Sequence, residues 1–384
     1  MRQTRNDIRQ AKNTAAAPDL PVGPWPAERP LQLWATALEG LGAIAARELA
    51  SLASAVAQTG DDLSLAVAPA GLVALLARAR TVEQILVQLG STKAETATDL
   101  DGLAGWLCAG WLPADADSHV KVHTVGCSAD RARWVQANLQ RRLPKGAGAK
   151  QVLHLRVLRD RVEVALDPAG WPLHQRGYRL EPGEAPLRET VAAALLQWAG
   201  MQAGMNIWDP TCGSATLPIE GLLLHQPLAR DWACRQWSAL PPQQAPEPGP
   251  VLARGWAGDM SAEAVERARR NVERAGLAEF LTLQHAEMAQ WRQSLGEFGM
   301  VVGNLPWGLR LGQRADARRT AQRWAAVVRR SAAGWRAAVV VAEPQLADIL
   351  GLDDCESLRC RAGGHAVWLV RGTVRRLPPT GAVP

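Results

Sequence analysis

Apolar residues recur along the chain in two rhythms, and the change comes near residue 191. The earlier part mixes short alternating runs, which are typical of strands, with runs of helical period. This mixture predicts a small α+β domain over residues 31–170. Its predicted elements are a strand and a helix over 31–52, a strand over 63–69, a helix over 71–90, a strand over 119–126, a helix over 128–143 and a strand pair over 152–168.

Beyond residue 191, strands and helices alternate. Ser261 is a candidate N-cap and Gly276 a candidate stop for one of these helices. The alternation predicts an α/β fold over 191–376, a doubly wound sheet whose ligand site lies beyond the carboxyl ends of its strands. The predicted segments are strand-turn-helix units over 205–224 and 254–277, strands over 280–288, 300–304 and 336–344, and a hairpin over 355–374.

The segments outside these two domains carry little apolar periodicity. Residues 1–30 include the Pro-rich run "PDLPVGPWPAERP" and are predicted to form a disordered tail. Residues 377–384 are predicted to form a second tail, and residues 171–190 a connector between the two domains.

The charge of the chain favours a polyanionic partner. Its net charge is +6 and its isoelectric point is about 9.3, which is typical of proteins that bind a polyanion such as a nucleic acid. No window approaches the roughly 18 apolar residues of a transmembrane helix. The N-terminus lacks the apolar core of a signal peptide, so we expect a cytoplasmic protein without membrane contact.

Cysteine and histidine spacing argues against a metal site. No two of the six Cys have C-x-x-C spacing. His119 and His123 alternate in "HVKVH" as in a half-buried strand, which we favour over a pair of metal ligands. The chain has 16 Trp beside 2 Phe and 1 Tyr, so Trp is expected at positions that commonly hold Phe or Tyr.

Three predicted strand ends carry groups suited to an adenosine-containing ligand. "DPTCGSAT" over 209–216 has glycine and helix-start features that bring backbone amides to a ligand, but its spacing is neither that of a P-loop nor a full dinucleotide fingerprint. Asp259 is placed to accept from a ribose diol and Glu287 from an adenine amine. A tight turn, a helix-capping acid and a solvated acid are the structural alternatives.

The fourth strand runs into "NLPW", residues 304–307. The Asn304 amide oxygen and the Leu305 carbonyl can both accept protons from an exocyclic NH2 group, which directs its nitrogen lone pair. Pro306 stiffens the loop, and Trp307 offers a face for an extruded base. The pattern indicates a site that holds a nucleobase amine beside an activated methyl group. The structural alternative is a Pro turn with a buried Trp.

These motifs together resemble those of THUMP-domain class I methyltransferases, over about residues 31–376. That family uses S-adenosylmethionine and methylates the 2-amino group of guanosine in tRNA or large-subunit rRNA. The segment "RDWACRQW" over 230–237 slightly favours the rRNA branch. The motifs that carry the resemblance are "LHQRGYR" (173–179), "APLRET" (185–190), "DPTCGSATLPIE" (209–220), "AGDMSAEAVERARRNVERAGL" (257–277) and "NLPWG" (304–308).

The resemblance implies a role for each site residue. It places Arg188 and Thr190 over the methionine end of the cofactor, Asp259 at the ribose and Glu287 at the adenine. It makes the 304–307 loop the catalytic segment, with Asn304 also beside the cofactor. The carboxypropyl side of the cofactor is assigned to Asp209, Cys212, Gly213 and Ser214.

The chain departs from the family pattern at several of these positions. The family usually has Gly where Ala215 stands, an acid at Ser261 and Asp at Glu287. Its fourth motif is more often "NPPY" or "NPPF", for which Leu305 and Trp307 are conservative replacements.

Four arginines on one predicted helix are candidate RNA contacts of the first domain: Arg131, Arg133, Arg141 and Arg142. A solvated helix face is the alternative. The residues leave two other functions open, an adenine 6-amino methyltransferase on rRNA or DNA and a non-catalytic RNA-binding protein that retains the fold. We favour methyl transfer to the 2-amino group of guanosine in structured RNA.

Overall fold

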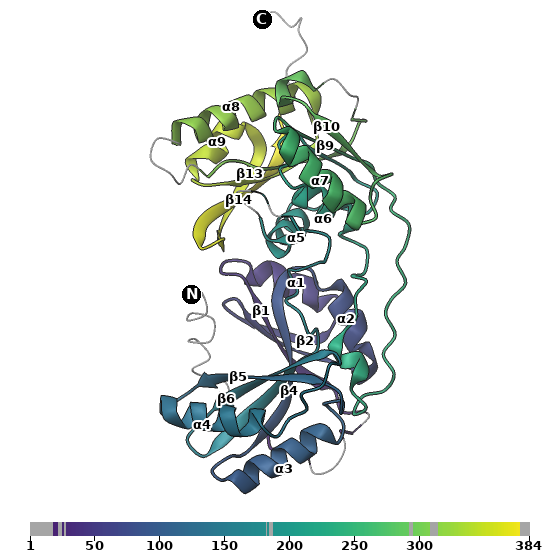
Figure 1. Cartoon of the computed structure of the whole chain (residues 1–384). Coiled ribbons are helices and arrows are strands. Elements are labelled where there is room, and N and C mark those ends of the chain that lie inside the picture. The colour runs from purple at the N-terminus through teal and green to yellow at the C-terminus, as the bar shows by residue number, and fades with distance from the viewer. Residues whose placement is uncertain are drawn as a thin grey trace, which may run out of the picture.

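The chain folds around two seven-stranded sheets, one from each half of the sequence (Figure 1). The computed structural model describes residues 18–21, 25–26, 28–181, 183, 187–291, 295–307 and 314–376. Within these ranges, no helix is both long enough and apolar enough to cross a membrane. The described residues also hold no group of three His, Cys, Asp or Glu side chains arranged for a metal ion.

The first sheet has the strand order β2-β3-β1-β4-β7-β6-β5, and its neighbours are antiparallel except for β5 and β6. The expected α+β mixture of elements is present. Its elements are β1 (Leu31–Ala37), α1 (Gly42–Ala50), β2 (Ser54–Thr59), β3 (Asp62–Val67), α2 (Leu72–Arg78), β4 (Val82–Lys93), α3 (Ala97–Cys108), β5 (Asp117–Thr124), α4 (Ala129–Gln140), β6 (Lys150–Val157) and β7 (Arg161–Asp167).

The helix predicted over 71–90 is wrong in its second half. The helix α2 ends at Arg78, and a twelve-residue strand, β4, follows from Val82 to Lys93. This strand lies in the middle of the sheet between β1 and β7 and is buried over most of its length. A strand covered on both faces loses the alternation that identifies it, and its apolar run imitates a helix.

Part of the segment predicted to be a disordered tail is ordered. Leu20 and Pro18 form backbone hydrogen bonds with Ser91 at the bridge between Asp19 and β4. The indole of Trp25 is buried and meets Trp111 edge to face at 5.6 Å. The rest of the predicted tails, residues 1–17, 22–24, 27 and 377–384, lies outside the described residues.

The second sheet has the order β10-β9-β8-β11-β12-β14-β13, with parallel strands as far as β12 and an antiparallel hairpin at the end. The predicted doubly wound fold is therefore confirmed. Its elements are α5 (Glu189–Trp198), β8 (Asn206–Asp209), α6 (Thr216–Leu223), β9 (Gly255–Asp259), α7 (Ala262–Arg274), β10 (Leu281–His285), β11 (Gly299–Asn304), α8 (Arg314–Ser331), β12 (Arg336–Val341), α9 (Gln345–Leu350), β13 (Leu352–Ala362) and β14 (His365–Val374).

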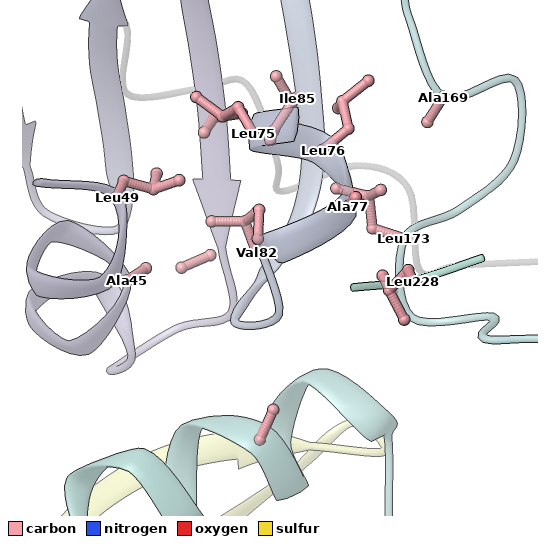
Figure 2. Packing of buried hydrophobic residues seen from close by; sticks show 14 of the residues in the cluster. Ala45, Leu49, Leu75, Leu76, Ala77, Val82, Ile85, Ala169, Leu173 and Leu228 are labelled. Atoms are coloured by element: carbon pink, nitrogen blue, oxygen red, sulfur yellow. The ribbon is translucent and has the colours of Figure 1, made fainter. Parts of the chain in front are cut away.

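A long return segment, residues 225–253, leaves the second half of the chain, runs along the first sheet and comes back (Figure 1). The amide of Leu228 donates to the carbonyl of Ala77 at 2.7 Å. The indole of Trp237 donates to Gln151 of β6 at 2.9 Å. Figure 2 shows Leu228 of the return segment and Leu173 of the connector next to Ala77, near the end of α2. The two halves therefore share one apolar core.

A buried carboxylate fastens three distant segments together. Glu220 of α6 is fully buried and accepts from Arg80 at 3.3 Å and from the hydroxyl of Tyr178 at 3.0 Å. The guanidinium of Arg176 lies 3.6 Å from the same carboxylate and donates to the carbonyl of Arg80 at 2.6 Å. Burial is the largest influence on Arg80 and lowers its pKa. The "RGY" segment of the connector therefore helps to hold the two halves of the chain together through Glu220.

Replacing Glu220 by Ala is expected to destabilise the protein by about 3–5 kcal/mol, because it leaves two buried guanidinium groups without their counter-charge. Urea unfolding followed by circular dichroism measures this loss. Glu266→Ala is the matched control, since Glu266 forms only exposed ion pairs with Arg269 and Arg270. It should change stability by less than about 1 kcal/mol. Equal unfolding midpoints for the two variants would show that the buried ion pairs of Glu220 do not stabilise the protein.

Candidate functional site

The strand order of the second sheet reverses between β8 and β11. From β8 the chain moves outward to β9 and β10, and it then returns to the other side of β8 with β11 and β12. The parallel pairing of β8 with β11 brings the turn after Asp209 and the loop after Asn304 to the same edge. Crevices at such switch points are where doubly wound sheets hold their ligands.

The turn after β8 is fastened to the end of β9. The backbone amide of Gly213 donates to Asp259 at 3.0 Å, and the amide of Cys212 donates to the carbonyl of Gly258 at 2.8 Å. The second oxygen of Asp259 accepts from the amide of Ser261 at 2.9 Å. The structure thus brings Gly213 and Asp259, two of the predicted site residues, into contact. The helix α7 is capped by Ser261 and not by Asp259, since the hydroxyl of Ser261 accepts from the amide of Ala264 at 3.2 Å.

Asp209 is a buried acid in this turn. Its side chain is 2% exposed and accepts from the amide of Thr211 at 3.0 Å. Burial, aided by the nearby charge of Asp259, raises the pKa of Asp209 to about 7. The carboxyl group thus takes up a proton near neutral pH, unlike an exposed aspartate.

Cys212 and Ser214 complete the turn. Burial raises the pKa of the Cys212 thiol well above its ordinary value, so the thiol stays protonated and is a poor nucleophile. The hydroxyl of Ser214 lies 3.3 Å from that of Thr216, and its carbonyl accepts from Asn271 of α7 at 3.1 Å. Both side chains are less than one-tenth exposed.

Ala215 stands in the left-handed region, with φ of 63°, as the N-cap of α6. This conformation costs an L-residue with a Cβ roughly 1–2 kcal/mol, which accounts for a preference for Gly at this point of the turn. The residue is fully buried, so its methyl group packs inside the protein.

The "NLPW" loop follows β11. The indole N–H of Trp307 donates to the side-chain oxygen of Asn304 at 3.1 Å, and the indole meets His365 edge-on at 6.3 Å. Leu305 is buried, and its amide donates to Val340 of β12 at 3.1 Å. Pro306 is exposed. This hydrogen bond could not be predicted from the sequence, because residue spacing does not specify the rotamer of Trp307. The Phe that is commoner at this position in the family could not form it.

Arg188 and Thr190 lie against a residue of the first sheet. Glu83 of β4 pairs with Arg188 at 2.5 Å, accepts from the hydroxyl of Thr190 and lies 3.3 Å from His174. Burial acts to raise the pKa of Glu83, but the hydrogen bonds from His174 and Thr190 and the charge of Arg188 outweigh it and hold the pKa below its ordinary value. No local sequence signal points to Glu83, because it falls in the segment predicted to be a helix.

The remaining predicted site residues have separate partners. Glu287 follows β10 and forms an ion pair with Arg323 of α8. Arg131 and Arg133 lie on α4, whereas Arg141 and Arg142 follow its end at Gln140. Arg133 pairs with Asp130, and Arg142 with Asp101 at 2.6 Å. The side chain of Arg131 donates to the carbonyl of Ala94, and that of Arg141 to Asn138 at 2.8 Å.

The profile of the family described as "RMKL-like, methyltransferase domain" matches residues 176–369, which is half of the chain. The chain belongs to this family. The matched range includes the "RGY" of the connector, both turns at the switch point and the strand β14 up to Leu369.

Relatives of this RMKL-like domain extend the match. "Ribosomal RNA large subunit methyltransferase K/L" of Pseudomonas paraeruginosa is 33% identical over 225 residues, which cover 52% of this chain and 31% of that protein. The match thus spans about a third of that relative. "Putative RNA methyltransferase YpsC" of Bacillus subtilis is 29% identical over 73% of this chain and 80% of its own length.

A solved structure shares the fold of nearly the whole chain. "SMU.472, a putative methyltransferase complexed with SAH" superposes with a TM-score of 0.73 over 91% of this chain and 100% of its own, at 19% identity. Because the superposition covers most of the chain, the likeness includes the first sheet as well as the RMKL-like domain.

Replacing Ala215 by Gly is expected to stabilise the protein by about 1 kcal/mol, because Gly adopts a positive φ without the Cβ clash. Thermal unfolding measures the change. Ala194→Gly is the matched control, since Ala194 lies inside α5 and is equally buried. It should destabilise by about 1 kcal/mol or more. Destabilisation by both variants would show that Ala215 is not strained.

The buried acid gives stability a pH dependence. The pKa of Asp209 is about 7 in the folded chain and near 3.8 for the free group, so the folded state holds a proton that the unfolded state has released. The stability contributed by this proton is full below the free pKa and is lost as the pH rises through 7. As the pH rises from 4 to 8, the free energy of unfolding should therefore fall less for Asp209→Asn than for the parent protein. Urea unfolding at each pH measures this difference. Parallel pH curves for the two proteins would disprove the raised pKa.

Proposed function

We propose that the protein transfers a methyl group from S-adenosylmethionine to the 2-amino group of a guanosine in structured RNA, with large-subunit rRNA favoured over tRNA. The observation that carries the proposal is the adjacency of β8 and β11, which sets the "DPTCGS" turn beside the "NLPW" loop. The RNA methyltransferase names of the relatives and the SAH complex of the solved neighbour support the same conclusion.

The residues of the first turn fit S-adenosylmethionine. Gly213 has a positive φ, and a Cβ there would meet no heavy atom within 4 Å, so open space lies beside the turn. In this arrangement Gly213 and Ser214 would lie at the amino-acid end of the cofactor and Asp259 at its ribose. Arg188 and Thr190, held by Glu83, would cover the methionine end, and Glu287 the adenine.

The loop after β11 would do the work on the target base. S-adenosylmethionine, when bound, supplies an electrophilic methyl group. Asn304 and the carbonyl of Leu305 would accept the two N–H bonds of the amine and direct its lone pair. The hydrogen bond from the indole of Trp307 would fix the orientation of the Asn304 amide. Positive charge that develops on the amine would strengthen that bond.

No nucleophile of the protein is required for this chemistry. Burial raises the pKa of Cys212 well above its ordinary value, and it raises the pKa values of Cys234 and Cys360 to about 12. Protonated thiols fit a direct displacement and not a covalent protein intermediate. The basic net charge of +6 fits an RNA substrate, with the THUMP-like first domain as its second contact.

Replacing Asn304 by Ala is expected to lower turnover by about 100–1,000-fold and to weaken cofactor binding much less, because the lost hydrogen bond strengthens mainly as the reaction proceeds. Purified protein is assayed with labelled S-adenosylmethionine on RNA from a deletion strain, and the product is digested to nucleosides. Calorimetry gives the cofactor affinity. The label is expected in guanosine methylated on its 2-amino group.

Gln284→Ala is the control, since this half-buried residue of β10 lies outside the proposed site and should keep full activity. Label in methylated adenine would assign the adenine alternative instead. Full activity of the Asn304→Ala protein would reject the role of the loop. RNA binding without any methyl transfer by the parent protein would leave the non-catalytic alternative.

A further inference from the structure

A cavity lies on the first sheet, and none of its lining residues belongs to the second sheet. Its volume is about 250 Å³, just below the roughly 300–1,000 Å³ of small-molecule pockets, so it could hold no more than one nucleotide-sized group. Four strands and the start of the connector form its walls. They contribute Glu83, Gln84 and Ile85 from β4, Lys121 from β5, Lys150 and Val152 from β6, Asp167 from β7, and residues 170–174 from the connector.

The cavity opens on the polar face of the sheet. Successive side chains of a strand point to opposite faces, so Lys150 and Val152 lie on one face of β6 and Leu153 and Leu155 on the other. The second face is buried under α4, whose Val135 is fully buried. The cavity is therefore on the opposite side of the sheet from the arginines of α4.

The cavity presents positive charge to a ligand. Lys121 and Lys150 are exposed, and neither forms an ion pair within the described ranges. The two carboxylates in the wall are engaged by the protein itself. Glu83 pairs with Arg188, and Asp167 accepts from the amides of Ala169 at 2.9 Å and Gly170 at 3.3 Å. The charge of Lys121 also acts on Asp167, where it opposes the burial that raises the pKa of this acid, and both ammonium groups remain exposed to an anionic partner.

An aromatic face completes the wall. Trp171 is 57% exposed, although most Trp side chains of the first half of the chain are buried or partly buried. A base of any type stacks on an indole, and lysines beside it neutralise the adjoining phosphates. An acidic peptide would use the lysines but would leave the indole unused, so the combination favours a nucleotide.

We propose that this cavity binds one unpaired nucleotide of the RNA, with its base on Trp171 and its phosphates at Lys121 and Lys150. The inference rests on the proposed RNA substrate and names a second contact for it. Glu83 lies in the cavity wall and also holds Arg188 and Thr190. Glu83 would therefore lie between a nucleotide in the cavity and Arg188 and Thr190, the proposed cofactor contacts.

The test uses the full-length protein and fluorescein-labelled RNA hexamers of adenosine or uridine, with binding followed by anisotropy at several salt concentrations. Trp171→Ala should weaken binding about 5- to 100-fold through the lost stack. The double variant Lys121→Gln/Lys150→Gln should lower the slope of log affinity against log salt by about 1.4, as expected for two single-strand phosphate contacts.

Matched controls separate the cavity from general charge and exposure. Phe298→Ala removes another exposed aromatic side chain, which is 53% exposed. Arg269→Gln/Arg375→Gln removes two exposed charges from the second half of the chain. Both controls should bind the hexamers like the parent protein, and all variants should unfold at the same temperature.

Parental hexamer affinity in both cavity variants would overturn the proposal, as would displacement of the hexamer by polyglutamate as readily as by unlabelled RNA. The activity assay keeps this result apart from the proposed function. If the parent protein methylates RNA and the cavity variants bind the hexamers normally, only the proposal about the cavity is rejected. Weakened hexamer binding in the variants, together with no methyl transfer by the parent, would support the cavity and reject the methyltransferase proposal.

Discussion

A single carboxylate without access to water constrains how the two halves of this chain meet. Glu220 sits on the helix that begins at the ligand-side turn of the second sheet, and its counter-charges come from the first domain and from the connector. A buried carboxylate is costly unless it is paired, so α6, the connector and the segment between α2 and β4 that carries Arg80 must fold into contact with one another. The same contacts hold the start of α6 and hence the turn in front of it.

The second domain is easier to predict from the sequence than the first. Strands such as β8, β9 and β12 are followed by helices, and some of these have clear caps, for example Ser261, whose side chain accepts from Ala264 as expected. In the first domain the pattern predicts a helix where β4 lies, since burial on both faces removes the period-two alternation. The strand β2 and the helix α3 are not predicted at all, although Thr96 and Asp99 form a capping box that signals the helix start.

The candidate site could be predicted as far as it lies at the ends of neighbouring strands. The turn of Gly213 with Asp259, and its place beside Asn304, follow from strand order alone. Contacts between residues far apart in the sequence did not follow. The partner of Arg188 is Glu83, 105 positions earlier, and no local pattern links them. The indole hydrogen bond to Asn304 depends on a side-chain rotamer that sequence spacing does not specify.

The return segment over 225–253 has a consequence for how such proteins diversify. The side chains of Trp237 and Gln243 form hydrogen bonds with Gln151, Pro69 and Val73 of the first half. The segment is nevertheless encoded between the strands β8 and β9 of the second sheet. The first half therefore cannot be exchanged independently of the second. A recombination event that replaced the first half would leave the return segment without the residues to which it forms hydrogen bonds. Inheritance of the pair as one unit is the outcome that this interleaving favours.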